Sequence, residues 1–163
     1  MIIKYLSLIL TLFFLGCGST DSKSAPKPTP TELLVPLYSE PTDKQNAIGN
    51  IWDAVAEASS GAPLTVIFGV IREDGAPVGT PNSNYTLGLK KLREGNASIL
   101  AYVETTNGSR DIEDVKTDVL AYANHFDIDG IFFDEVNGDM QFTDYYNKIT
   151  NYAKSFDSVK KLC

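Results

Sequence analysis

Residues 98–135 read SILAYVETTNGSRDIEDVKTDVLAYANHFDIDGIFFDE, and this stretch decides the fold. It begins with an apolar run at 98–105 and ends with a second apolar run at 128–135. Between them apolar residues recur at helical spacing over 112–126, with Asp111 or Ser109 placed to cap the helix. Two strands joined by a single helix are parallel, because a crossover returns the chain to the same edge of the sheet. The stretch therefore predicts one unit of a parallel α/β sheet.

The same alternation of strand and helix extends in both directions along the chain. The further elements that it predicts are strands 33–38 and 64–70 and helices 48–58, 85–94 and 142–156. Gly95 is expected to end one helix as its C′ residue, and Thr143 is a candidate cap for the last. Four strand–helix units predict either a doubly wound sheet or a (β/α)₈ barrel. Both architectures place ligand chemistry in the loops after the carboxyl ends of the strands.

Composition excludes several classes of protein. The chain has 163 residues and is 43% hydrophobic, which predicts one globular domain. A formal charge of −7 argues against nucleic acid as a partner, because phosphate neutralisation needs clustered Lys and Arg. Two cysteines, Cys17 and Cys163, are too few for a disulfide framework and have no metal-ligand spacing. No glycine-rich phosphate-binding motif follows a predicted strand, so a nucleotide cofactor is not expected. The acids between Asp127 and Asp139 do not match the spacing of a calcium-binding EF-hand, so a metal is not expected either.

The N-terminal residues have the pattern of a secretory targeting signal. Residues 1–16 place Lys4 before an apolar run too short to span a bilayer, which predicts a signal peptide. The FLGC sequence that ends at Cys17 is similar to a bacterial lipobox, so Cys17 is expected to be lipidated and to hold the protein at the cell envelope. An ordinary signal peptide with a chance cysteine is the alternative. Residues 17–31 are rich in Ser, Pro and Lys and predict a flexible tether, followed by the domain at 32–163.

Acidic and aromatic residues gather where the predicted strands end. Tyr38 follows the first strand, Tyr102 and Glu104 lie at the end of the third, and Asp134 and Glu135 end the fourth. Aromatic rings stack on the apolar faces of sugars, while one acid can attack or deprotonate and another can protonate the leaving oxygen. Glycoside hydrolysis is therefore one interpretation. The alternative is that the acids only end a strand and cap a turn.

Strand geometry separates the two adjacent acids. Neighbouring residues of a strand point to opposite faces, so Asp134 and Glu135 cannot both face one pocket unless the strand breaks there. If Asp134 points inward, Phe132 does so too. Glu104 lies on the neighbouring strand within possible reach of Asp134, and Tyr102 would line the same pocket. We take Asp134 as the preferred catalytic carboxylate.

Several ordered motifs together resemble the spherulation-specific family, also called spherulin 4 like proteins. The motifs are LLVPLYSEP at 33–41, WDAVAEAS at 52–59, PNSNY at 81–85, LAYVETTNGSR at 100–110, DVKTDVLAYA at 114–123 and DGIFFDE at 129–135. The resemblance implies a (β/α)₈ barrel and a glycoside hydrolase acting on α-1,4-linked galactosamine or N-acetylgalactosamine polymers of microbial exopolysaccharide. It also implies that Asp134 and Glu135 are the catalytic acids. The substrate contacts are then expected from Tyr38, Asn82, Tyr102 and Glu104.

The resemblance also implies strands beyond those predicted here, one of which carries a second catalytic Glu. We therefore expect about four βα units, the N-terminal half of the barrel, from a C-terminally truncated chain with weak or no hydrolase activity. The first and fourth strands would then be open edges through which two copies could dimerise. A non-catalytic carbohydrate-binding remnant and a structural lipoprotein are the alternative functions.

Overall fold

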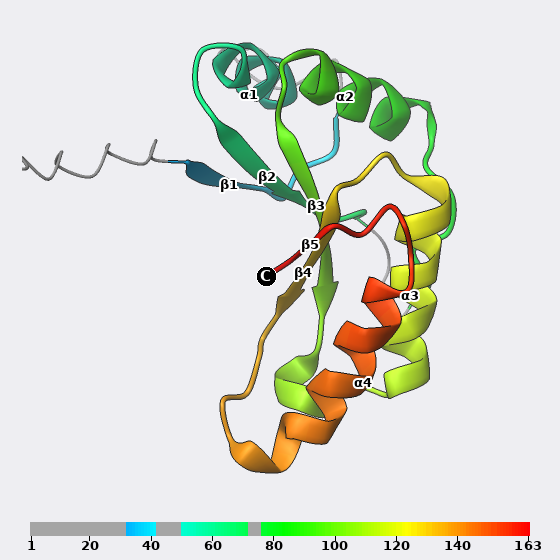
Figure 1. Cartoon of the computed structure of the whole chain (residues 1–163). Helices are drawn as coiled ribbons and strands as arrows, with labels where there is room; N and C mark the ends of the chain where they lie inside the picture. The colour runs from blue at the N-terminus through cyan, green and yellow to red at the C-terminus, as the bar shows by residue number, and fades with distance from the viewer. Residues whose placement is uncertain (1–31, 42–49, 72–75) are drawn as a thin grey trace, which may run out of the picture.

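A computed structural model describes residues 32–41, 50–71 and 76–163 (Figure 1). The predicted signal peptide, Cys17, the tether and the start of the first helix at Ile48 lie outside the described residues. Among those described, no helix is long and apolar enough to cross a membrane. The elements in chain order are β1 (Leu33–Leu37), α1 (Ile51–Ser59), β2 (Leu64–Phe68), α2 (Ser83–Glu94), β3 (Ser98–Glu104), α3 (Ile112–His125), β4 (Gly130–Asp134), α4 (Thr143–Lys154) and β5 (Lys161–Leu162).

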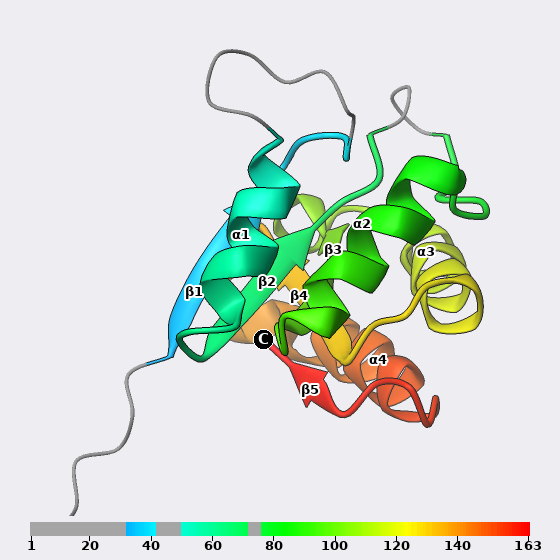
Figure 2. The same ribbon diagram turned by 90° about the horizontal axis from the view of Figure 1, so that it is seen from above.

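The strands form one parallel sheet in the order β1-β2-β3-β4-β5. Within the described residues, helices α1 to α4 cover one face of this curved sheet and no α-helix lies on the other, called here the helix-free face (Figures 1 and 2). Each helix returns the chain to the same end of the sheet, so every strand ends at the same edge. The parallel α/β fold predicted from the sequence is confirmed, and its extension to a closed barrel remains a prediction.

The core lies between the sheet and the helices. Alternate strand residues point into it, among them Phe68 on β2, Val103 on β3 and Phe133 on β4, each at most 6% exposed. Trp52 of α1 and Tyr122 of α3 meet the Phe68 ring edge-on, at centroid distances of 6.1 and 5.7 Å. Burial of this aromatic cluster holds the helix layer on the sheet.

Of the two helix N-caps predicted from the sequence, the one for α3 is confirmed and the one for α4 is wrong. Asp111, one of the two candidates, caps α3 by accepting a hydrogen bond from the Glu113 amide at 2.7 Å. The cap at Thr143 is wrong: Thr143 is the first residue of α4, and its hydroxyl donates to the Met140 carbonyl instead.

Gly95 ends α2 for a reason other than the one expected. Its backbone is right-handed, with φ −80°, and the left-handed residue is Asn96, with φ 66°. A Cβ at Gly95 would lie 2.2 Å from both the Ala56 carbonyl oxygen and the Ser59 hydroxyl. Glycine is needed here so that α2 can pack closely against α1.

The expectation that β4 is an open edge is wrong. β5 pairs with β4 in parallel, and the Cys163 amide extends the ladder by donating to the Ile131 carbonyl at 3.2 Å. Gly130 makes this pairing possible, because a Cβ there would lie 2.0 Å from the Lys161 carbonyl oxygen. A dimer through sheet edges remains a prediction.

Candidate functional site

The candidate site lies on the helix-free face of the sheet, at the carboxyl ends of β3 and β4. Glu104 and Asp134 are the last residues of these strands and stand directly opposite each other in the register, as do Tyr102 and Phe132 one pleat earlier. Ile131 and Phe133 point into the core, so Phe132 and Asp134, which alternate with them along β4, face away from the helices. The predicted inward orientation of Asp134 follows from this register. Neighbouring parallel strands lie about 4.8 Å apart, so the two carboxylates share one stretch of surface.

Two tyrosines form the aromatic wall of this site. The rings of Tyr38 and Tyr102 meet edge to face, with centroids 5.4 Å apart and planes at 72°. Tyr38 is 55% exposed, so much of its ring is available to a ligand. An aromatic pair with one exposed ring beside carboxylates is an arrangement that suits stacking against a sugar.

The pKa of Tyr102 shows how closely the acids surround it. Burial raises this pKa, and the charge of Asp134 and a hydrogen bond with that carboxylate raise it further. The charges of Glu104 and Glu135 act in the same direction. Burial and the charge of Asp134 also raise the pKa of Tyr38. The Tyr102 phenol therefore keeps its proton and faces an anionic group of three carboxylates.

The extended strand ends at Asp134. A break at this point is what would allow Asp134 and Glu135 to face the same site. Glu135 has φ 53°, in the left-handed region that non-glycine residues rarely occupy. Because the chain turns there, Glu135 does not take the helix-facing position that a continued strand would give it. Its charge acts on the same Tyr102 phenol as that of Asp134.

The loop after β3 supports this break. The Asn107 amide donates to the Glu135 carbonyl at 2.8 Å, and the Thr106 hydroxyl donates to the Glu104 carboxylate at 2.9 Å. Thr106 and Asn107 are themselves left-handed, with φ 46° and 55°. Backbone strain of this kind persists where surrounding contacts hold it, and it concentrates at functional sites.

Asn82 has a different environment from the other predicted site residues. It caps α2, and its side-chain oxygen accepts from the amides of Asn84 at 3.0 Å and Tyr85 at 3.1 Å. Among the described residues no hydrogen bond joins Asn82 to the acids or to the two tyrosines. Its substrate contact remains a prediction.

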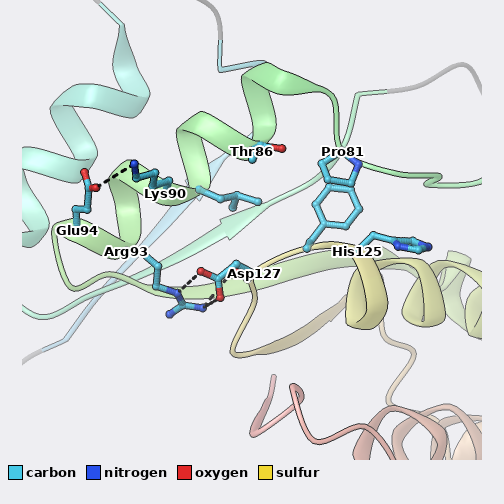
Figure 3. Close-up of a pocket in the computed structure, with 9 residues that line it drawn as sticks. Pro81, Thr86, Lys90, Arg93, Glu94, His125 and Asp127 are labelled. Atoms are coloured by element: carbon cyan, nitrogen blue, oxygen red, sulfur yellow. Dashed lines mark hydrogen bonds and ion pairs between the residues drawn. The ribbon is translucent and has the colours of Figure 1, made fainter.

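Two surface pockets lie apart from Glu104, Asp134 and Glu135. One of about 490 Å³ opens on the helical face between α2 and α3, where Arg93 pairs with Asp127 and where His125 lies (Figure 3). The other, of about 510 Å³, is on the helix-free face near Lys161, at the amino ends of the strands. Within the described part of the chain, no group of three or more His, Cys, Asp or Glu side chains is arranged to hold a metal ion.

The family model described as spherulation-specific family 4 matches residues 32–162 of the chain. The chain belongs to this family. A curated relative, Spherulin-4 of Physarum polycephalum, is 34% identical over 128 residues, which are 77% of this chain and 36% of the relative. Among solved structures the chain is similar to Aspergillus clavatus Sph3 in complex with GalNAc, with a TM-score of 0.64 and 28% identity over 81% of this chain and 55% of Sph3. The chain thus spans little more than a third of the curated family member and about half of Sph3.

Proposed function

We propose that this family member carries the sugar-binding wall and acidic groups of a glycoside hydrolase site for α-1,4-linked galactosamine or N-acetylgalactosamine polymers. The observation that carries the proposal is the meeting of Asp134 with Tyr102 and Glu104 at the ends of adjacent parallel strands. Ligand sites of parallel α/β proteins lie at this end of the strands. The solved relative Sph3 was crystallised with GalNAc, which supports an amino sugar as the ligand.

The charge of the site supports a polymer that is partly deacetylated. Glu104, Asp134 and Glu135 act together on one phenol, so their combined field favours a cation nearby. The 2-amino group of galactosamine is protonated at neutral pH, whereas N-acetylgalactosamine is neutral. We expect galactosamine units to bind more tightly, and added salt to reduce that preference.

The proposed chemistry assigns roles to the same residues. Tyr38 and Tyr102 would hold the sugar ring, and the Tyr102 hydroxyl would orient the Asp134 carboxylate. Asp134 and Glu135 would supply the acids beside the reacting carbon and the glycosidic oxygen, with Glu104 as a substrate contact. The further catalytic Glu that the family resemblance implies would come from a later strand. Turnover by this chain alone remains predicted to be weak, so binding is the more sensitive readout.

Binding and cleavage by Asp134→Asn test this proposal. The probes are α-1,4-linked oligosaccharides of galactosamine and of N-acetylgalactosamine, followed by calorimetry and by release of reducing ends. We expect Asp134→Asn to abolish any turnover and to weaken binding of the galactosamine oligomer about tenfold, with a smaller effect on the neutral oligomer. Asp157→Asn, an equal charge change in the turn before β5, is the matched control and should change neither.

The outcomes separate the functional classes. Binding without turnover in the wild type, surviving Asp134→Ala, would favour a carbohydrate-binding module over a hydrolase. If neither oligomer binds to the wild type, both carbohydrate functions are wrong and a structural lipoprotein is left.

We propose in addition that lipidation of Cys17 holds the domain at the cell envelope. The support is the sequence pattern of residues 1–17 alone. Mass spectrometry of the protein from a membrane fraction should find an acylated Cys17, and Cys17→Ser should release the protein into the soluble fraction. An unmodified Cys17 in a membrane-free protein would contradict this proposal.

A further inference from the structure

Thr105 is the first residue after β3, and its side chain is completely buried beside the candidate site. Its hydroxyl lies 2.8 Å from the Asp134 carbonyl oxygen and 2.9 Å from the Glu135 carbonyl oxygen. Its backbone amide also donates to the Asp134 carbonyl, at 3.1 Å. Thr105 thus contacts the main chain of both adjacent acids.

These contacts are possible only because the chain turns at Glu135. Consecutive carbonyl groups of an extended strand point to opposite sides, so one hydroxyl cannot reach both. With φ 53° at Glu135, the two carbonyl groups converge on the Thr105 hydroxyl. A hydroxyl has a single proton, which the two acceptors must share or take in turn. The same hydroxyl is therefore matched to the turned chain and not to a continued strand.

Thr105 is itself held in place by the loop that follows it. Its carbonyl oxygen accepts hydrogen bonds from the amides of Gly108 at 2.9 Å and Arg110 at 3.3 Å. The Arg110 guanidinium donates to the preceding Glu104 carbonyl at 3.0 Å. Hydrogen bonds from the loop after β3 thus hold the carbonyl groups of both Glu104 and Thr105, and with them the backbone that carries the Thr105 hydroxyl.

We propose that Thr105 is a positioning residue whose hydroxyl holds the strand break at Glu135 and so brings the Asp134 and Glu135 carboxylates to one mouth. This inference rests on the proposed function, since it is through these acids that Thr105 would affect sugar binding. Thr105 touches the backbone of the acids and not the substrate, so its effect is indirect. Loss of the hydroxyl would let the chain after Asp134 relax toward extended geometry, which moves Glu135 away and loosens Asp134.

Isosteric replacement isolates the hydroxyl. Thr105→Val keeps the volume and branching of the side chain and removes the donor, while Thr105→Ser keeps the donor. Thr65→Val is the matched control, because Thr65 is also buried, at 7% exposed, and lies on β2 near the amino ends of the strands. Each variant is compared by thermal unfolding, by binding of the α-1,4-galactosamine oligosaccharide, and by ultraviolet titration of Tyr102, identified by subtraction of Tyr102→Phe.

We expect Thr105→Val to weaken oligosaccharide binding about tenfold and to let Tyr102 ionise at lower pH, because Asp134 no longer stays beside the phenol. Thr105→Ser should stay within about twofold of the wild type in binding. Thr65→Val should lower only the melting temperature. Unchanged binding and unchanged Tyr102 titration in Thr105→Val would overturn the proposal, as would equal losses in Thr105→Val and Thr105→Ser.

Two further readouts keep the inference separate from the proposed function and from folding. If the wild type binds no oligosaccharide, the proposed function fails, whereas the Tyr102 titration still shows whether Thr105 holds Asp134. If Thr105→Val does not fold, hydroxyl-proton exchange in the wild type decides. A slowly exchanging Thr105 hydroxyl proton, seen by NMR, supports the contact, and rapid exchange contradicts it.

Discussion

Replacement of Tyr102 by Phe tests the contact between the phenol and the acids through the dependence of stability on pH. Burial, the charge and hydrogen bond of Asp134, and the charges of Glu104 and Glu135 all raise the pKa of Tyr102 above its usual 10.0. The folded protein therefore holds this proton more tightly than the unfolded chain. By linkage, the contribution of Tyr102 to stability is complete below pH 10 and is lost as pH rises toward the folded pKa.

The size of this loss follows from the proton balance. A group that stays protonated in the folded state while it ionises in the unfolded state lowers the free energy of unfolding by about 1.4 kcal/mol for each pH unit. Tyr102 is partly exposed, so water screens the acids and reduces the effect. The unfolded phenol is only half ionised at pH 10.0, so the full loss over the first pH unit above 10.0 is ~1.0 kcal/mol, and we expect about half of it, or ~0.5 kcal/mol.

Urea unfolding at a series of alkaline pH values measures this slope. Tyr102→Phe should lose ~0.5 kcal/mol less than the wild type over that first unit. Asp134→Asn should fall between them, because two of the causes of the raised Tyr102 pKa disappear. Tyr152→Phe removes a phenol from α4, where its ring meets Phe156, and is the matched control. An identical slope in the wild type and Tyr102→Phe would refute the reasoning.

Two further predictions concern stability. Gly108→Ala should cost about 2 kcal/mol in urea unfolding, because Gly108 has φ 81° and a Cβ there would lie 2.7 Å from the Phe142 ring. Gly138→Ala is its control, since nothing lies within 4 Å of the added Cβ, and an equal cost in both variants would contradict the steric explanation. The pKa of Asp129 is lowered, because hydrogen bonds from the Arg93 guanidinium and a backbone amide outweigh the opposing effect of burial. The contribution of Asp129 to stability is therefore present above pH 3.8 and lost as pH falls. Asp129→Asn should lower the free energy of unfolding by about 1 kcal/mol at neutral pH and reduce the loss of stability at acidic pH. An unchanged loss of stability at acidic pH would refute the assignment.

The first four strands and their parallel orientation could be predicted because each of the four carries a clear apolar pattern. β3 and β4 lie in strongly apolar runs, so their parallel pairing and the common face of Tyr102, Glu104 and Asp134 follow from period-two alternation. The N-cap of α3 could be narrowed to Asp111 or Ser109, and the structure places it at Asp111, whose carboxylate precedes the first apolar residue of the helix.

Other features depend on contacts between distant segments and leave no local pattern. β5 has two residues, Lys161 and Leu162, too few to show alternation, and pairs because Gly130 leaves room beside β4. Glycine is needed at position 95 because of Ala56 and Ser59 in α1, which lie 39 and 36 positions earlier in the chain. The part played by Thr105 was missed as well, since its partners are backbone carbonyls about 30 residues away.

The most direct test of the account is NMR mapping of an α-1,4-galactosamine oligosaccharide on the folded chain. We predict that the largest shift changes fall at the ends of β3 and β4, around Tyr102, Glu104 and Asp134, and that Asp134→Asn greatly reduces them. Shift changes confined to the hollow between α2 and α3, around His125 and Arg93, would contradict the account.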